Sequence, residues 1–233
     1  MPAIDLVERS VARHGGRQRW ERGGTLVIQP ATLTGFIPRA KGVGRTFPLP
    51  PRMEIALGQY KAVFRDYPKP GAFGEFDNGR VALRSTDGTV IEEDPNHRAS
   101  FDGLQKNRHW SPLDALYFFG YALSYYHAMP FDLGRTRYVS LQGSALTVDF
   151  PPEIHTHCTR QTFHFDETGL ISAHDYVAEI ISPWARGRHR WLNYENADGL
   201  MIARTRDVRA LLLGWQSPLV ALHAEFRAVH VEG

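Results

Sequence analysis

The chain has 233 residues, of which 42% are hydrophobic and 22% charged, the composition of a soluble globular protein with a sizeable core. Its formal net charge of +2 is too small to indicate a nucleic-acid partner. A single cysteine, Cys158, excludes an intramolecular disulfide framework. Because no repeat, low-complexity tract or break in composition divides the chain, we expect a single domain over residues 1–233.

The N-terminal residues predict a short helix. Residues 4–14 suit an amphipathic helix that ends at Gly15 and Gly16. Residues 1–16 carry charges throughout and lack the apolar core of a signal peptide, and no later segment reads as a membrane span. We therefore expect a cytoplasmic protein with no membrane partner.

A long region of β character follows. Residues 25–29, 55–64, 80–85 and 90–92 are predicted strands, and the last two form a hairpin around the Asp-Gly turn that separates them. Residues 35–51 contain three glycines and four prolines, which predict an irregular loop. This loop is either a lid or a plain connector.

One long helix is predicted from Ser111 to Ala128. Ser111 can cap it, Pro112 suits its first turn, and Asp114 favours the positive end of its dipole. One side of the helix carries Asp114, Tyr117, Tyr121, Ser124 and Tyr125, and the opposite side Leu116, Phe119, Ala122, Leu123 and Tyr126. Such a helix fits between a core and a pocket or interface. The alternative is packing alone, with the tyrosine hydroxyls reaching solvent.

Residues 149–180 hold four histidines on what the apolar-polar alternation predicts as one β-hairpin. We expect strands over residues 155–165 and 170–180, joined by a turn at residues 166–169. If all the turn residues loop out, Gln161 lies opposite His174 on one face of the hairpin. The alternative for each histidine is that it decorates a solvated face of the sheet.

A second register of this hairpin is open. If Gly169 forms a bulge, Asp166 pairs with Leu170 and His174 moves to the other face, because a slip of one residue exchanges the faces. We favour the first register, since it places Arg160 opposite Asp175 as a cross-strand ion pair.

The C-terminal part predicts two closing strands. Residues 184–196 read as a weak helix or a ragged connector, and residues 201–209 and 219–231 alternate as strands. An exposed edge beside these strands leaves homodimerisation open, although no residue demands it.

The histidine hairpin also supplies the candidate site. Histidine titrates near neutral pH and can take and give a proton, so a base oriented by a neighbouring amide or carboxylate could act on a substrate held against aromatic rings. The candidate catalytic residues are His157, His174, Asp175 and Tyr176, where the tyrosine would donate to a developing oxyanion. The candidate substrate-binding residues are His155, Gln161, Tyr117, Tyr121 and Tyr125.

Other chemistries are poorly supported. A metal could be held by His155, His157 and His174, but His-x-His is a short and common pattern, and we predict no metal. In a regular strand Cys158 points away from His157, which argues against a cysteine nucleophile. No phosphate-binding loop, dinucleotide fingerprint or flavin motif is present, so we expect no cofactor.

Several phrases together resemble a group of cytosolic bacterial proteins of similar length whose members are generally hypothetical. They are DPNHRASF, HWSPLDALYFFGYALSYY, MPFDL, FPPEIHTH and QTFHFDETGLISAHDY, within residues 79–206. The resemblance extends more loosely to the LolA-like lipoprotein-carrier fold. It implies an α+β fold, a strongly curved antiparallel sheet forming a half-barrel, with the long helix covering its concave face.

This chain departs from the pattern in two ways. Lipoprotein carriers have a signal peptide and this chain shows none, which argues against lipoprotein transport. Cys158 stands where the resemblance leads us to expect a serine after the Thr-His step, which argues against a shared serine-based chemistry.

Two functions of different classes follow. The first is a cofactor-free isomerase, cyclase or lyase that acts by histidine acid/base chemistry on a hydrophobic, polyketide- or terpenoid-like metabolite. The second is a binding or carrier protein that holds a lipid or other hydrophobic ligand without chemistry. Paired histidines inside the cavity would favour the enzyme, and an all-apolar cavity with the histidines outside it would favour the carrier.

Overall fold

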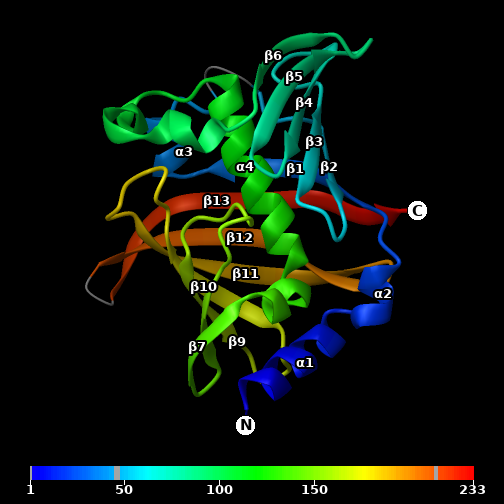
Figure 1. The fold of residues 1–233 in the computed structure, drawn as a ribbon, viewed down its shortest axis with the longest axis vertical. Helices are drawn as coiled ribbons and strands as arrows, with labels where there is room; N and C mark the ends of the chain where they lie inside the picture. Colours follow the sequence, from blue (N-terminus) through cyan, green and yellow to red (C-terminus); the bar gives the residue numbers. More distant parts are fainter. Residues whose placement is uncertain (1, 45–47, 213–214) are drawn as a thin grey trace.

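The computed structural model describes residues 2–44, 48–212 and 215–233, and within them one antiparallel sheet of 13 strands dominates the molecule (Figure 1). The strands are β1 (Thr25–Thr34), β2 (Arg52–Ala56), β3 (Lys61–Arg65), β4 (Ala72–Asp77), β5 (Arg80–Ser85), β6 (Val90–Asp94), β7 (Arg137–Gln142), β8 (Ala145–Asp149), β9 (Arg160–Phe165), β10 (Ile171–Val177), β11 (Arg186–Ala197), β12 (Leu200–Leu212) and β13 (Trp215–Glu232). The helices are α1 (Ala3–Arg13), α2 (Arg17–Glu21), α3 (Phe36–Ala40), α4 (Pro112–Ala128) and the short 3₁₀ turns η1 (His97–Phe101), η2 (Gly103–Asn107) and η3 (Phe131–Arg135).

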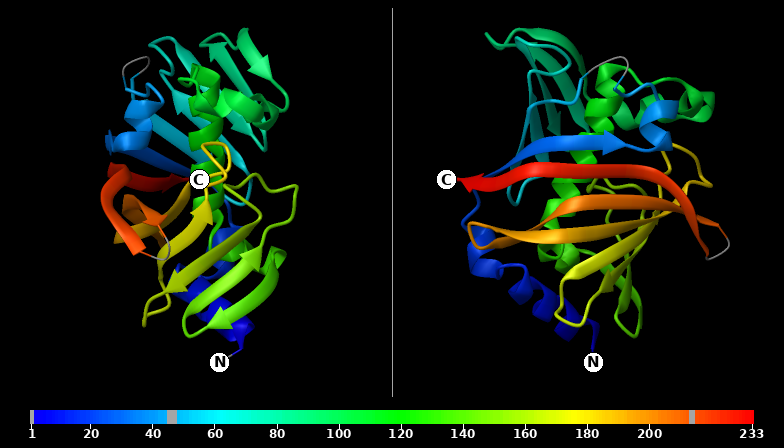
Figure 2. Two further views of the ribbon diagram at one scale, coloured as in Figure 1. Left: turned by 90° about the vertical axis from the view of Figure 1, so that its left-hand side faces the viewer. Right: turned by 180° about the vertical axis from the view of Figure 1, so that it is seen from behind.

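The sheet consists of two meanders joined by its first and last strands. Strands β1 to β6 pair in sequence order, strands β7 to β13 do the same, and β13 pairs with β1. Strands β6 and β7 therefore lie at opposite ends of the strand order, and the sheet is open. Figure 2 shows how strongly its long strands bend. The prediction of an antiparallel sheet is therefore confirmed: the sheet is large and open, and it is accompanied by a few helices.

This topology dictates where α4 must run. Because β6 and β7 are the two edges, the segment between them has to cross the sheet. With 17 residues, α4 spans about 25 Å of that crossing. In Figure 1 the helix passes in front of the strands from one meander to the other.

The start of α4 forms as the sequence predicts. The Ser111 side chain accepts a hydrogen bond from the Asp114 backbone N–H at 3.2 Å, and the Asp114 carboxylate accepts one from the Ser111 N–H at 2.8 Å. This capping box satisfies two donors that the helix itself cannot pair. Both sides of the helix are buried, including Tyr117, Tyr121 and Tyr125, so the alternative with solvent-exposed tyrosine hydroxyls is wrong.

The N-terminal helix is present, and it packs on the edge of the second meander (Figure 1). Leu6, Val7 and Val11 of α1 are buried in the main core. Among the described residues, no helix combines the length and the apolar character needed to cross a membrane.

Several predicted boundaries are wrong. Residues 55–64 form parts of two strands, β2 and β3, because residues 57–60 make the turn between them. The predicted weak helix at 184–196 is the strand β11, whose inward-facing Gly187, His189 and Trp191 alternate with more polar neighbours. Strands β7 and β8 were not predicted. The loop at 35–51 contains the short helix α3, and residues 45–47 lie outside the described residues.

The histidine hairpin combines both predicted registers. The Asp166 N–H bonds the Leu170 carbonyl, as in the second register, but a bulge at Ser172 then restores the faces of the first. His174 therefore lies opposite Phe163 rather than Gln161, yet shares a face with both. The first predicted strand is also shorter, because residues 155–159 precede β9 rather than extend it.

The predicted pair of Arg160 with Asp175 does not form. Arg160 lies opposite Asp149 of β8 and donates to its carboxylate at 2.8 Å and 3.0 Å. Asp175 instead pairs with Arg188 of β11 at 2.7 Å. The register that favoured the pair is displaced by the Ser172 bulge, which shifts Asp175 to a position opposite Thr162.

Candidate functional site

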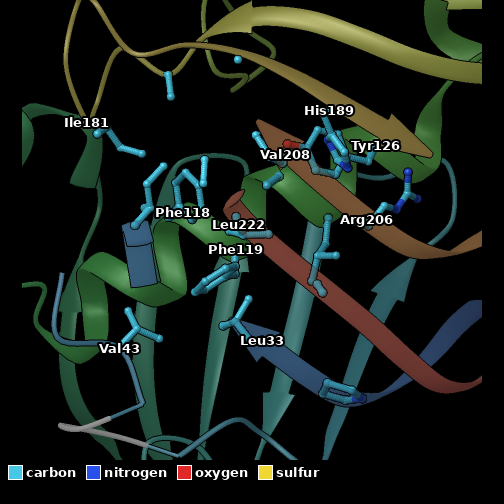
Figure 3. Close-up of a pocket in the computed structure, with 18 of the residues that line it drawn as sticks. Leu33, Val43, Phe118, Phe119, Tyr126, Ile181, His189, Arg206, Val208 and Leu222 are labelled. Carbon is cyan, nitrogen blue, oxygen red and sulfur yellow. The ribbon is translucent and has the colours of Figure 1, made fainter. Parts of the chain in front are cut away.

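An apolar cavity of about 400 Å³ lies between α4, the inner face of strands β10 to β13, and α3 with the residues that follow it. Phe118, Phe119 and Leu123 line it from α4, and Val208 and Leu222 from the sheet. Figure 3 shows Phe118, Phe119 and Leu222 in the middle of this lining. Its volume lies within the range of small-molecule sites, which are mostly apolar with a few placed polar groups.

The cavity has an open and a closed end. Phe36 of α3 and Trp184 in the loop after β10 line it and are exposed, by 47% and 87%. Tyr126, His189 and Arg206 also line it, and all three are buried. In Figure 3 these three lie together, away from Val43 and Leu33. The open end is therefore apolar, and the polar groups gather at the closed end.

Strand register explains how the polar groups reach this face. Leu222, Val208, His189 and His174 are successive cross-strand partners from β13 to β10. The next row pairs Ala224 with Arg206 and Arg206 with Trp191. Since directly paired residues share a face, both rows point to the inside of the sheet.

A layer of tyrosine–histidine hydrogen bonds lies behind the cavity wall. Three tyrosines spaced four residues apart form one stripe on α4. Tyr117 bonds His155 Nδ1 and Tyr121 bonds His157 Nδ1, each at 2.8 Å. The sequence-predicted residues Tyr117, Tyr121, Tyr125, His155, His157, Gln161, His174 and Tyr176 all come together in this layer.

The hydrogen bonds around His174 assign its tautomer. Trp191 Nε1 donates to His174 Nδ1 at 3.0 Å, so the ring proton is on Nε2 and is donated to the Tyr125 hydroxyl at 3.2 Å. The Tyr125 hydroxyl then donates to Gln161 Oε1 at 3.3 Å, and Gln161 Nε2 donates to the Cys158 carbonyl at 2.9 Å. Each side chain in this series of hydrogen bonds, from Trp191 to Gln161, has a partner, as a buried network requires.

His157 is equally well occupied. Tyr121 bonds its Nδ1 and Tyr126 bonds its Nε2, while Tyr176 stacks on its ring with centroids 4.0 Å apart. Burial lowers the pKa of both His157 and His174 well below the usual value. Both rings are therefore neutral at pH 7, and their nitrogens already bond protein groups.

Only some of the predicted site residues line the cavity. Tyr176 lines it, whereas His157, His174, Gln161 and the three tyrosines do not. Asp175 faces the outside of the sheet, where it accepts from Arg188 and contacts His164 Nε2 at 2.9 Å. The catalytic roles assigned to these residues stay predictions, and the structure adds no contact with the cavity for the histidines.

Two residues of the closed end were missed in the sequence. Arg206 is 3% exposed and His189 1% exposed. Within the described residues, Nε and Nη1 of Arg206 and both ring nitrogens of His189 have no hydrogen-bond partner. His189 fell in a segment that the sequence predicts as helix or connector. Arg206 lies in a predicted strand with Arg204 and Arg209, and no pattern distinguishes it from them.

The described residues support neither a metal site nor a reactive cysteine. In the part of the chain that the structure describes, no three or more His, Cys, Asp or Glu side chains are grouped so that they could hold a metal ion. Burial raises the pKa of Cys158 to about 11, and its thiol donates to the Arg160 carbonyl at 3.1 Å. A protonated, hydrogen-bonded thiol is a poor nucleophile.

No protein-family model matches this chain, and no curated protein matches it either. Among solved structures, it is similar to a DUF1329 family protein from Desulfovibrio piger, with a TM-score of 0.52 and 11% identity over 99% of this chain and 93% of that one. It is also similar to a LolA superfamily protein from Nitrosomonas europaea, with a TM-score of 0.48 and 9% identity over 100% of this chain and 94% of that one. The first similarity shows a shared fold.

Proposed function

We propose that this protein binds or carries a hydrophobic small molecule in the cavity beside α4, without acting on it chemically. The observation that carries the proposal is the cavity itself, about 400 Å³ of space lined mainly by apolar side chains and open at one end. Exposed Phe36 and Trp184 at the open end extend the apolar surface to the outside. Apolar surface of this kind is retained in a folded protein where it serves binding.

A half-barrel arrangement of the sheet and α4 supports this proposal. In a half-barrel the long helix covers the concave face of the curved sheet and leaves space between helix and sheet. The close approach of Gly120 to Phe76 holds the middle of α4 against β4, and Phe119, Ala122 and Leu123 of the same part of the helix line the cavity. A carrier needs this kind of space between rigid layers, because side chains then need not move far to admit cargo.

The enzymatic alternative gains no support. The similar structures provide none, and the histidines on which it depends lie behind the cavity wall with their nitrogens bonded. By the criterion set by the sequence, the position of the predicted histidines outside the cavity favours the carrier, although the lining is not all apolar, because His189 and Arg206 lie at its closed end. A cytoplasmic location, homodimer formation and the absence of nucleic-acid and membrane partners stay predictions.

A cavity-blocking variant tests the proposal. We expect Leu222→Trp to weaken binding of a neutral apolar fluorescent dye by roughly tenfold or more, because the indole occupies space inside the cavity. Leu219→Trp is the matched control, since Leu219 lies on the same strand, is 67% exposed and does not line the cavity. Fluorescence titration measures both variants. Equal binding by Leu222→Trp and the wild type would mean that the dye, and the function, are elsewhere.

A further inference from the structure

The closed end of the cavity holds a buried cation without a counter-ion. Arg206 does not form a salt bridge within residues 2–44, 48–212 and 215–233, and its Nε and Nη1 lack hydrogen-bond partners. Its guanidinium carbon lies 4.0 Å from the centroid of the Trp191 ring and 5.7 Å from that of Tyr126. Cation–π contacts offset only part of the free energy that burying a charge costs.

The groups around Arg206 do not supply negative charge. Tyr125, Tyr126 and Tyr194 are the ionisable groups that favour its charge, and burial raises the pKa of each of them above 10. They are therefore neutral at pH 7. Burial lowers the pKa of Arg206 itself to about 10, so the guanidinium keeps its charge at neutral pH.

A neighbouring donor is also unpaired. Both ring nitrogens of His189 lack partners, and burial lowers the pKa of the ring well below its usual value. A neutral imidazole carries one N–H, which it can donate to an anion. His189 and Arg206 lie on adjacent strands and both line the closed end.

The missing partner has to come from the cavity. On its other side Arg206 borders a space of only about 10 Å³, which is at the lower limit for one water molecule. The cavity side offers about 400 Å³, and its lining beyond the closed end is apolar. A ligand that satisfies the whole lining therefore has a compact head of one negative charge and a hydrophobic body.

We infer that the ligand is a hydrophobic carboxylic acid, such as a fatty acid, whose carboxylate pairs with Arg206 and accepts from His189 while its body fills the apolar part of the cavity. This assignment rests on the proposed binding function and names its ligand class. A carboxylate fits because the guanidinium fork matches its two oxygens and its single charge balances that of Arg206. A phosphate monoester would bring a second negative charge that no other side chain at the closed end balances.

Competition binding against a neutral dye tests this assignment on the delipidated full chain. Palmitic acid should bind roughly tenfold to a hundredfold more tightly than methyl palmitate, which has the same body and no charge. Equal affinities of acid and ester would overturn the assignment but leave the binding function standing. If neither ligand nor the dye bound, the binding function itself would fail.

A substitution at Arg206 then tests whether the ligand carboxylate binds there. Arg206→Met should remove the preference for the acid, so that palmitic acid and methyl palmitate bind with affinities within about threefold of each other, since methionine keeps an apolar lining of similar length. Arg204→Met is the matched control, because Arg204 lies on the same strand and pairs with Glu195 at 2.8 Å. Retention of the acid preference in Arg206→Met would show that the carboxylate binds elsewhere. The comparison of acid with ester in the wild type does not depend on how either variant folds.

Discussion

At Arg206 the folded chain keeps a buried positive charge that none of the residues described in the structure neutralises. Removing a charge from water costs several kcal/mol, and an ion pair or ligand is needed to recover it. The uncompensated charge of Arg206 therefore lowers the stability of the ligand-free protein, and an anionic ligand would restore that stability on binding. Such a trade is common at binding sites.

This leads to a prediction for the ligand-free protein. Arg206→Met should raise the free energy of unfolding by about 1–4 kcal/mol, because an apolar side chain of similar size replaces an uncompensated buried charge. Urea unfolding at neutral pH measures the change. Arg204 pairs with Glu195 and donates to the Phe226 and Arg227 carbonyls, so Arg204→Met should lower stability, the opposite sign to Arg206→Met. A less stable Arg206→Met would mean that the guanidinium already has its partners within the protein.

Single residues also mark the limit of prediction from the sequence. The helical period correctly puts Tyr117, Tyr121 and Tyr125 on one side of α4, because a helix has a fixed period and its caps were readable. That side faces the histidine layer rather than the cavity. The unpaired state of Arg206 and His189 is not a property of their own segments. It depends on the register between β11 and β12 and on the contact of both strands with α4, which is far from them in the sequence.

At the scale of elements, the site depends on how closely α4 approaches β4. A Cβ atom added to Gly120 would lie 2.5 Å from Phe76, and one added to Gly74 would lie 2.9 Å from the Leu116 side chain. Glycine in the middle of a helix normally destabilises it. Its presence at 120 is explained by the contact with the strand.

We therefore expect Gly120→Ala to destabilise the fold by about 1–3 kcal/mol through overpacking, although the same change stabilises an exposed helix. Thermal unfolding followed by circular dichroism gives the sign. Gly134→Ala is the control, because a Cβ there meets no atom within 4 Å. A rise in stability for Gly120→Ala would show that α4 can move away from β4 without loss.

The histidine hairpin shows what the sequence can and cannot specify within an element. Alternation correctly put His174 on the same face as Gln161 and Phe163, which is the information that the period of a strand contains. The bulge at Ser172 could not be predicted, since no glycine or proline marks it. Beyond the bulge, the first predicted register differs from the real one by two residues and the second by one. The predicted Arg160–Asp175 pair was wrong for the same reason.

For the whole molecule, the enclosed layer between α4 and the sheet makes folding sensitive to acid. Burial lowers the pKa of His14 to about 4 and that of His127 to about 3, and it lowers those of His157, His174 and His189 as well. The carboxyl groups behave differently. Burial raises the pKa of Asp114, but hydrogen bonds from His97, Ser111 and Arg108 outweigh it and lower that pKa to about 2. Histidines and carboxyl groups thus titrate in separate pH windows.

The sign of the histidine effect follows from linkage. A histidine with a depressed pKa in the folded state is protonated first in the unfolded chain, so stability is complete above about pH 6.5 and falls as the pH drops toward 4. Each such histidine contributes up to about 1.4 kcal/mol per pH unit in that window. The stability contributed by Asp114 is present above its unfolded pKa, near 3.8, and is lost only below that value.

We expect the free energy of unfolding, measured with urea at a series of pH values from about 7.5 to about 4.5, to decline steeply below pH 6.5. His127→Gln should flatten the decline by about 1.4 kcal/mol per pH unit, because it removes one buried titrating ring. His109→Gln is the matched control, because His109 is exposed. A flat profile in the wild type would mean that the buried histidines reach water before the protein unfolds. The layer between α4 and the sheet would then be open to solvent, and the end of the cavity at Arg206 could not be closed to water.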